Sequence, residues 1–123
     1  MNPLATALIV LVGIIHLWFC VFEMFFWQTS YTAKLFSTTR EQLEETAVLA
    51  SNQGVYNAFL GVGLLLTLVV DAKKSIFLAQ NYLLICVIIA GVYGAWTASK
   101  KIFFFQALPA IVALICNFLR SGA

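Results

Sequence analysis

Two ionisable side chains inside apolar sequence are the residues of this chain best placed to do chemistry. His16 and Glu23 both lie in the first apolar segment, on one stripe of a helix and about two turns, or about 10 Å, apart. They are too far apart to bond directly, but water or a substrate between them can relay a proton, as in acid–base catalysis. Because ionisable groups are costly in hydrocarbon unless they pair or line a cavity, we expect a functional role for both.

Uncharged polar side chains in the other apolar segments extend this candidate site. They are Asn52, Gln53, Tyr56 and Asn57 in the second segment, Tyr93 and Thr97 in the third, and Gln106 in the fourth. Helical periodicity places these side chains on the interior side of their helices. We therefore expect one polar pocket, with both ionisable residues, Asn52 and Gln106 directed into a shared interior cavity.

The polar residues also match in estimated depth. Counting 1.5 Å per residue from the side of the first and third connections places Glu23, Asn52 and Gln106 about 6 to 8 Å inside the membrane boundary. The same count places His16 and Asn57 about 15 to 17 Å inside, near the midplane. We therefore expect a shallow and a deep polar layer in one leaflet. The opposite half should be almost purely apolar, apart from one amide near the end of the last segment.

Each of these residues also has an ordinary structural interpretation. The amides can act as hydrogen-bond links between helices, at about 0.6 to 2 kcal/mol each. A neutral imidazole at His16 can be satisfied by one amide or carbonyl group, and Glu23 is shallow enough for partial hydration. The joint placement of His16 and Glu23 favours a functional role, and the structural interpretation stays open for each amide.

The composition indicates an integral membrane protein. Hydrophobic residues make up 63% of the chain and charged residues 10%, with a mean hydropathy of +0.98, far outside the usual range for soluble domains. We predict one all-α domain, 1–123, that forms a compact, antiparallel bundle of four transmembrane helices. The helices are expected at about 3–27, 39–70, 76–98 and 102–119. The expected partner is the lipid bilayer, and no nucleic-acid partner is expected.

Local signals refine two of these helices. Thr38 with Glu41, and Thr39 with Gln42, form overlapping capping-box patterns, so the second helix should start outside the membrane, near Thr39. In the fourth helix, Pro109 should introduce a kink that frees a backbone carbonyl group beside the candidate site.

The distribution of Lys and Arg residues gives little information about the orientation of the chain in the membrane. One side of the four-helix topology carries Lys34, Arg40, Lys100 and Lys101, and the other carries Lys73, Lys74 and Arg120. The positive-inside rule leans toward placing the first and third connections in the cytoplasm, but the near balance also permits dual insertion. Small residues at Gly91, Gly94, Ala95 and Ala98 permit close backbone contact, so this seam is expected either to join two copies in a homodimer or to pack within the bundle.

Metal ions and cofactors are not expected. A single His cannot supply the His-rich or Cys-rich ligand sets of zinc, copper or haem sites. Cys20, Cys86 and Cys116 are widely spaced in apolar sequence, which is typical of small buried side chains rather than of a redox pair. No nucleophile elbow, phosphate loop or dinucleotide motif occurs.

Several motifs resemble one known family. They are His16, Glu23-Met24-Phe25-Phe26-Trp27, Asn52-Gln53-Gly54, Tyr56-Asn57, Ala90-Gly91-Val92-Tyr93-Gly94, Gln106 and Pro109-Ala110. Over nearly the whole chain, the sequence resembles the bacterial integral-membrane family called domain of unknown function 1304. Ser51 departs from the expected pattern, which has Ala or another small residue there. The resemblance implies a compact four-helix protein of the bacterial cytoplasmic membrane, and it implies no activity.

Three classes of function are compatible with this sequence. The first is a protein that binds or carries a lipophilic or cationic small molecule in a pocket of one leaflet, with proton exchange at Glu23 coupled to ligand occupancy. The second is a membrane-embedded enzyme acting on a lipid or isoprenoid-like substrate, with Glu23 and His16 as acid and base. The third is an accessory scaffold subunit whose polar residues hold the bundle together. We rank them in this order.

Overall fold

The first long helix begins at a strong capping signal. The computed structural model describes residues 2–97 and 99–121, which contain helices and no strand. Helix α1 (Pro3–Phe25) starts after Asn2, whose side-chain oxygen accepts a 2.8 Å hydrogen bond from the backbone N–H of Leu4. Pro3 occupies the first helical turn, where its missing N–H has no helical partner to lose.

The long connection after α1 contains a short helix that the sequence pattern did not predict. Helix α2 (Ser30–Leu35) is capped by the side chain of Thr29, which accepts a hydrogen bond from the backbone N–H of Thr32. Helix α3 (Arg40–Leu66) then begins with a complete capping box. Thr39 Oγ1 accepts from the Gln42 N–H at 3.2 Å, and Gln42 Oε1 accepts from the Thr39 N–H at 3.2 Å. The predicted start near Thr39 is therefore confirmed, whereas the helix ends before the expected residue 70.

The chain from Lys73 onward forms a helical hairpin with a wide turn in its second arm. Helix α4 (Lys73–Thr97) is followed by the π-helix η1 (Phe103–Ala107), which continues directly into α5 (Leu108–Ser121). The backbone N–H of Leu108 reaches back five residues to the carbonyl of Phe103. Pro109 has no N–H to donate to the preceding turn, so the expected irregularity takes the form of a π-helical segment.

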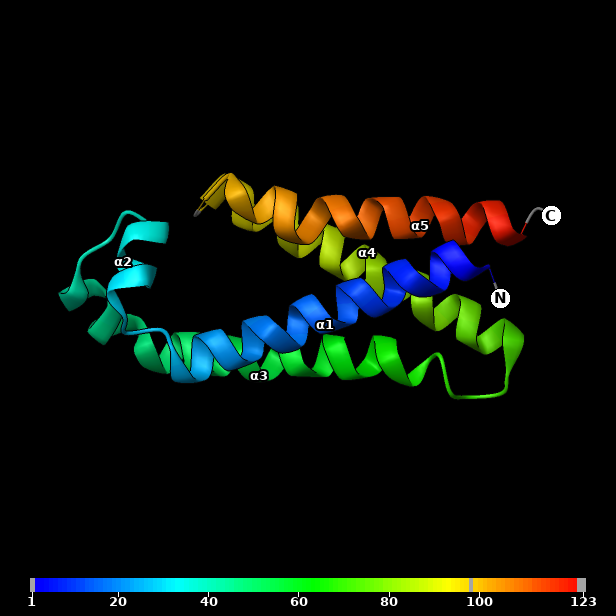
Figure 1. Ribbon diagram of the computed structural model, residues 1–123, viewed down its shortest axis with the longest axis horizontal. Coiled ribbons are helices and arrows are strands. Elements are labelled where there is room, and N and C mark those ends of the chain that lie inside the picture. Colours follow the sequence, from blue (N-terminus) through cyan, green and yellow to red (C-terminus); the bar gives the residue numbers. More distant parts are fainter. Residues whose placement is uncertain (1, 98, 122–123) are drawn as a thin grey trace.

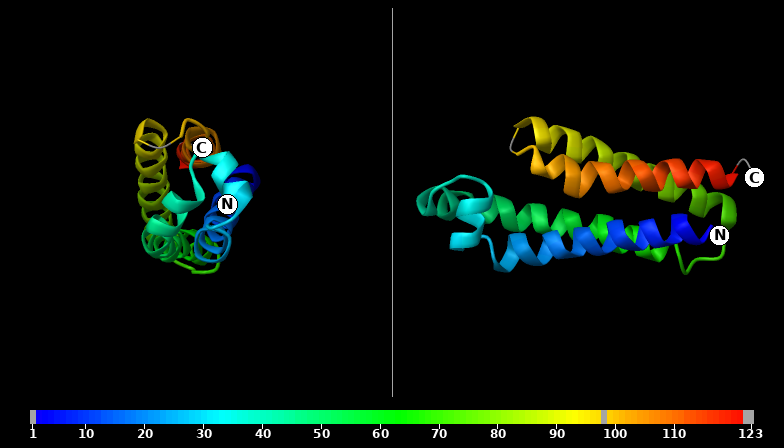
Figure 2. Two further views of the ribbon diagram at one scale, coloured as in Figure 1. Left: turned by 90° about the vertical axis from the view of Figure 1, so that its left-hand side faces the viewer. Right: turned by 45° about the horizontal axis from the view of Figure 1, so that its top comes forward.

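The four long helices pack as two antiparallel pairs. Helix α1 lies beside α3 along its length, and α5 with η1 lies beside α4, which crosses the bundle diagonally (Figure 1). Helix α1 also packs against α5, whereas α3 and α4 make fewer contacts. Figure 2 shows α2 at one end of the molecule, and the start of α1 and the end of α5 at the other. The predicted antiparallel order of helices agrees with this arrangement.

Glycines set the close approach within each pair. A Cβ atom on Gly61 of α3 would lie 2.8 Å from the carbonyl oxygen of Gly13 in α1, which leaves no room for a side chain. In the other pair, a Cβ atom on Gly91 would lie 2.7 Å from the backbone nitrogen of Ala107, and Gly94 faces Ile102. Gly91 and Gly94 of the small-residue seam therefore pack within the chain, and the expected homodimer stays a prediction.

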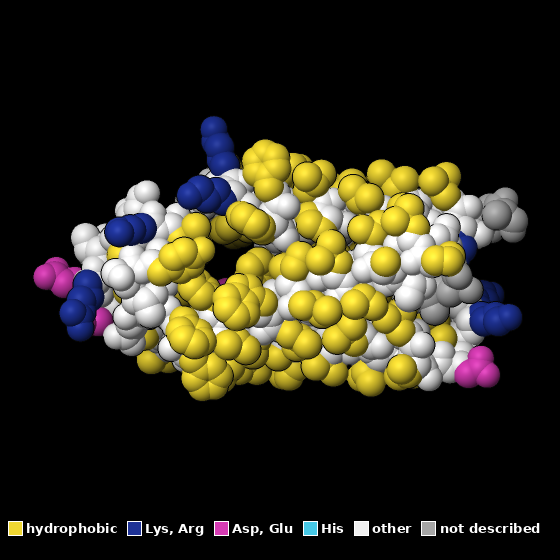
Figure 3. All heavy atoms as spheres, viewed as in Figure 1, with side chains coloured by type: hydrophobic (Ala, Val, Ile, Leu, Met, Phe, Trp, Pro, Cys, Tyr) yellow, Lys and Arg dark blue, Asp and Glu magenta, His cyan; other side chains and the backbone are white. Residues whose placement is uncertain are grey.

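The surface of the helices is largely apolar, as is typical of a bundle that lies in a membrane. Large apolar side chains cover the helices, and charged side chains gather at the two ends of the molecule (Figure 3). Three segments are long and apolar enough to cross a membrane: Pro3–Phe25, Lys73–Trp96 and Phe103–Arg120. Helix α3 is longer than these segments, but Asn52, Gln53 and Asn57 lower its hydropathy, so the expected fourth span stays a prediction.

Candidate functional site

His16 is completely buried and is hydrogen-bonded at both ring nitrogens. Its Nδ1 lies 2.8 Å from the carbonyl oxygen of Val12, one turn back in α1, and its Nε2 lies 3.3 Å from Nε2 of Gln106. The Val12 carbonyl can only accept, so Nδ1 carries the proton and Nε2 accepts from the Gln106 amide. The arrangement is that of a neutral imidazole linking α1 to η1.

The π-helical turn carries the partner of His16. Gln106 is 9% exposed and belongs to η1, immediately before Ala107, whose backbone packs on Gly91 of α4. A π-helix adds a residue to a turn and so changes the direction of the side chains that follow the insertion, a feature common at functional sites. Here, the π-helix contacts α1 through Gln106 and contacts α4 through Ala107.

Glu23 forms the second polar link, between α1 and α3. The Asn57 side-chain amide donates a 2.9 Å hydrogen bond to Glu23 Oε2. Asn57 is 3% exposed, and its own Oδ1 has no hydrogen-bond partner in the described part of the chain. Glu23 is half-buried. The ion pair recorded among residues 2–97 and 99–121 joins Arg40 and Glu44, so Glu23 has no basic residue as a counter-charge there.

The two observed pairs each join a residue expected in the shallow layer to one expected in the deep layer, so the predicted layers are wrong. A helical side chain leans toward the N-terminus of its own helix. Because α1 and α3 are antiparallel, Glu23 and Asn57 lean toward each other and meet between the estimated depths. Figure 1 also shows α1 inclined to α5, so residue counts from a common boundary do not give equal depths for His16 and Gln106.

Four other residues expected at the site are exposed. Asn52, Gln53, Tyr56 and Tyr93 all lie at accessible positions, and the side chain of Thr97 lies outside the described residues, as does Ala98. The expectation that Asn52 points into an enclosed cavity beside Glu23 is therefore wrong, since Asn57 is the partner of Glu23. Gln53 lies one turn before Asn57 in α3, on the same side of the helix. It is thus the exposed amide positioned nearest to the Glu23–Asn57 pair along that helix.

A hollow lies at the α2 end of the bundle. Figure 3 shows the surface hollowed between the α1–α3 pair and the end of the α4–η1 hairpin, on the side of α2. The hydrophobic cluster that fills the interior, by contrast, joins Ile9 and Val12 of α1 to Leu64, Leu84 and residues of α5, toward the end that carries both termini. One half of the bundle is therefore tightly packed, and the other half is open.

A second group of buried amides lies in the other half of the bundle, and the sequence analysis recognised Asn117 but missed Gln80 and Asn81. Gln80 donates to Thr67 Oγ1 at 3.1 Å, and Asn117 donates to Asn81 Oδ1 at 2.8 Å. The expectation that this half of the bundle is almost purely apolar is therefore wrong. The signal was present in the sequence: adjacent amides at Gln80 and Asn81 in an apolar segment need partners as much as Asn57 does.

Side-chain clusters suited to metal binding are absent from residues 2–97 and 99–121. No group of three His, Cys, Asp or Glu side chains there is placed to hold an ion. Cys20, Cys86 and Cys116 are free, half-buried thiols on different helices. The site offers one carboxyl group, one imidazole and amides, which suits hydrogen bonding and charge pairing.

Comparisons with known proteins identify relatives over nearly the whole chain. The family model described as "Protein of unknown function (DUF1304)" matches residues 10–118. The chain is 32% identical over 120 residues to the "Uncharacterized protein YpaA" of Lactococcus lactis subsp. lactis (strain IL1403). The matched region covers 96% of this chain and 99% of that protein. No solved structure matches the chain.

Proposed function

This chain belongs to the DUF1304 family, and we propose that it binds a small lipophilic cation within the membrane, between the α1–α3 pair and the α4–η1 hairpin. Glu23 supplies the counter-charge in this proposal. Asn57 positions the carboxylate, and the His16–Gln106 pair holds the adjoining helices together.

The observation that carries the proposal is a carboxyl group in an apolar segment that has no basic partner among residues 2–97 and 99–121. Such a group is costly in hydrocarbon unless something pairs with it. The Asn57 amide contributes one neutral donor, while its oxygen stays unused nearby. A carboxylate and an amide oxygen together suit a ligand with a positively charged N–H group, and the apolar walls of the bundle suit the rest of an amphiphilic ligand.

The proposal also requires the site to lie within the bilayer. Helix α1 has the length and composition of a membrane span, and α3 packs beside it along its length. If α1 crosses the membrane, α3 therefore crosses with it, and Asn57 faces α1 inside the bundle. Glu23 lies in the last turn of α1, at the end of the bundle where α2 and the hollow lie, so we expect a ligand to reach it from the hollow.

Proton coupling follows from the same carboxyl group. A proton and a ligand cation both neutralise Glu23, so they compete, and cation binding should weaken as pH falls. An acid–base enzyme is less well supported, because both ring nitrogens of His16 are already engaged by protein groups.

Binding of a fluorescent lipophilic amine tests the proposal. Dansylcadaverine carries one ammonium group and an aromatic body, and its N-acetyl derivative keeps the body but loses the charge. We expect saturable binding of the amine to the protein in nanodiscs, measured by fluorescence anisotropy. Glu23→Gln should weaken binding by about 10- to 100-fold, because a charge-assisted hydrogen bond contributes about 1.5 to 3 kcal/mol.

Two controls make the result specific. Glu44→Gln removes an acidic residue that is exposed and paired with Arg40, so it should leave dansylcadaverine binding unchanged. The acetylated probe should bind weakly and equally to wild-type protein and Glu23→Gln. Equal affinity of the amine for both proteins would instead support the scaffold interpretation of the polar residues.

A further inference from the structure

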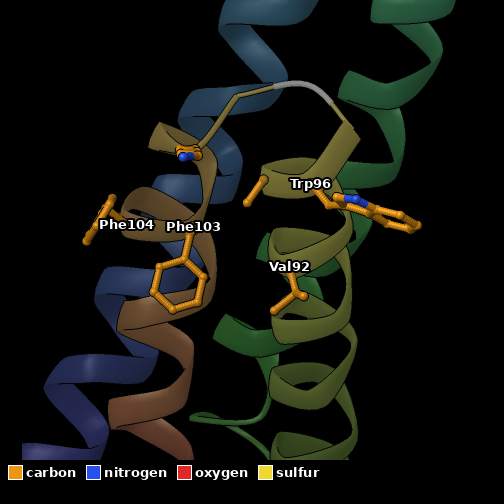
Figure 4. Close-up of a pocket in the computed structure, with 6 residues that line it drawn as sticks. Val92, Trp96, Phe103 and Phe104 are labelled. Carbon is orange, nitrogen blue, oxygen red and sulfur yellow. The ribbon is translucent and has the colours of Figure 1, made fainter.

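A groove lies on the outer surface between the end of α4 and the start of the next helix. It is about 360 Å³ in volume and is lined by Val92, Ala95, Trp96, Lys100, Phe103 and Phe104. Figure 4 shows Val92 and Phe103 facing one another across it, with Trp96 and Phe104 extending from the two helices on either side. It is separate from the polar pairs, since it contains none of their residues.

The walls of the groove suit a hydrocarbon chain. Five of its six lining side chains are apolar or aromatic, and Trp96 and Phe104 are 85% and 63% exposed. Helix α4 and the η1–α5 helix both have the length and composition of membrane spans, so these exposed rings face lipid. A trough of this kind on a membrane-facing surface accommodates an acyl chain lying along the helices.

The end of the groove carries positive charge at the expected depth of lipid headgroups. Lys100 lines the groove, Lys101 follows it, and both are exposed in the connection between α4 and η1. Neither takes part in an ion pair within the described part of the chain. Trp96 lies in the last turn of α4, directly before this connection, and indole rings concentrate at the boundary between hydrocarbon and headgroups.

We propose that this groove binds one anionic phospholipid of the surrounding bilayer. One acyl chain lies between Val92 and Phe103, and the phosphate-containing headgroup is held by Lys100 and Lys101. Charge complementarity selects the occupant, because a zwitterionic lipid can fill the apolar walls equally well but gains less from two lysines. This inference does not depend on ligand binding at Glu23.

Quenching of Trp96 by lipids with brominated acyl chains tests the proposal. In protein with Trp18→Phe and Trp27→Phe, Trp96 is the remaining tryptophan and reports directly on the groove. Brominated phosphatidylglycerol should reach half-maximal quenching at an up to about 25-fold lower mole fraction than brominated phosphatidylcholine, because each of the two lysines contributes about 5-fold. Each of the substitutions Lys100→Gln and Lys101→Gln should lower this preference by about 5-fold, and the two together should remove it.

Matched variants separate the groove from the general charge of the protein. Lys73→Gln with Lys74→Gln removes the same charge at the other end of the bundle and should leave the preference at Trp96 intact. Ala95→Leu partly fills the groove without changing charge and should reduce quenching by phosphatidylglycerol. Protein in which Trp18 is the remaining tryptophan should be quenched equally by both lipids. Equal quenching of Trp96 by the two lipids, or a preference that persists without Lys100 and Lys101, would overturn the proposal.

Discussion

At the scale of single residues, the buried polar groups in the open half of the bundle are engaged in pairs. His16 donates to its own helix and accepts from η1, so one imidazole fixes the position of two elements. Glu23 has a single amide donor and no counter-charge in the described part of the chain. Both ring nitrogens of His16 are thus hydrogen-bonded, whereas the Glu23–Asn57 pair keeps a carboxylate and an amide oxygen that can accept from a further group. For this reason, the proposed ligand is placed at Glu23.

Removing the donor to His16 should destabilise the fold. Gln106→Leu leaves Nε2 of a fully buried imidazole without a partner, which should lower the free energy of unfolding by about 1 to 3 kcal/mol. The measurement is thermal or denaturant-induced unfolding in detergent, followed by circular dichroism. Gln53→Leu makes the same replacement at an exposed amide and should change stability by less than about 0.5 kcal/mol.

A double substitution distinguishes a lost hydrogen bond from lost packing. His16→Leu combined with Gln106→Leu removes both polar groups, so no buried nitrogen is left unpaired. The double variant should therefore be less destabilised than the sum of the two single variants. Strict additivity would contradict a direct bond between the two side chains.

At the scale of helices, the α1–α3 pair depends on glycines at defined positions. Gly61→Ala places a Cβ atom 2.8 Å from the Gly13 carbonyl, and backbone atoms cannot move aside as a side chain can. We expect a loss of about 1 to 3 kcal/mol in unfolding free energy, as for other overpacked contacts. The measurement is again unfolding in detergent.

Gly63→Ala is the matched control on the same helix. Its Cβ atom would first meet the flexible tip of Leu83, at 3.3 Å, so the neighbour can yield. Since Ala favours helix over Gly, stability should be unchanged or raised by up to about 1 kcal/mol. Similar losses for both variants would show that helix α3 responds to volume in general rather than to contact with the α1 backbone.

Local signals in the sequence predicted the helix starts better than they predicted the contacts. The capping box at Thr39 and Gln42 involves neighbouring residues only, so it can be recognised without the fold. The partner of Glu23 depends on the register of two antiparallel helices and on the lean of both side chains. That register is set by packing at Gly54 and Gly61, which residue counting does not include. Asn52 was therefore expected where Asn57 lies.

The buried amides toward the end of the bundle that is opposite α2 also show that contacts between helices are hard to predict from sequence. Asn81 and Asn117 lie in different helices, and their bond depends on how α4 crosses α5. Their residue types could be recognised as needing partners, but the identity of each partner could not be derived from spacing. The family resemblance did not supply this information, because it carried no contact between specific residues.

At the scale of the whole molecule, the antiparallel order of the helices fixes which connections share a side of the membrane. Residues between α1 and α3 lie at the same end of the bundle as the connection from α4 to η1, and the α3–α4 connection lies at the opposite end (Figure 1). The hydrophobic core extends over the end that carries the termini, while the hollow lies toward α2. A ligand would therefore enter from the side of α2, and only a membrane crossing by α3 puts Glu23 and Asn57 in the bilayer together.

Cysteine accessibility tests this topology and the fourth span. In protein with Cys20, Cys86 and Cys116 replaced by Ala, single substitutions Ser37→Cys, Ser99→Cys and Ala72→Cys place thiols in the three connections. A membrane-impermeant maleimide applied to intact and then to permeabilised spheroplasts should label the first two from one side and Ala72→Cys from the other. The reason is that α3 packs along the full length of α1 and cannot stay outside a membrane that α1 crosses. Labelling of Ser37→Cys and Ala72→Cys from the same side would mean that α3 does not cross, and it would remove the Glu23–Asn57 pair from the hydrocarbon environment on which the binding proposal rests.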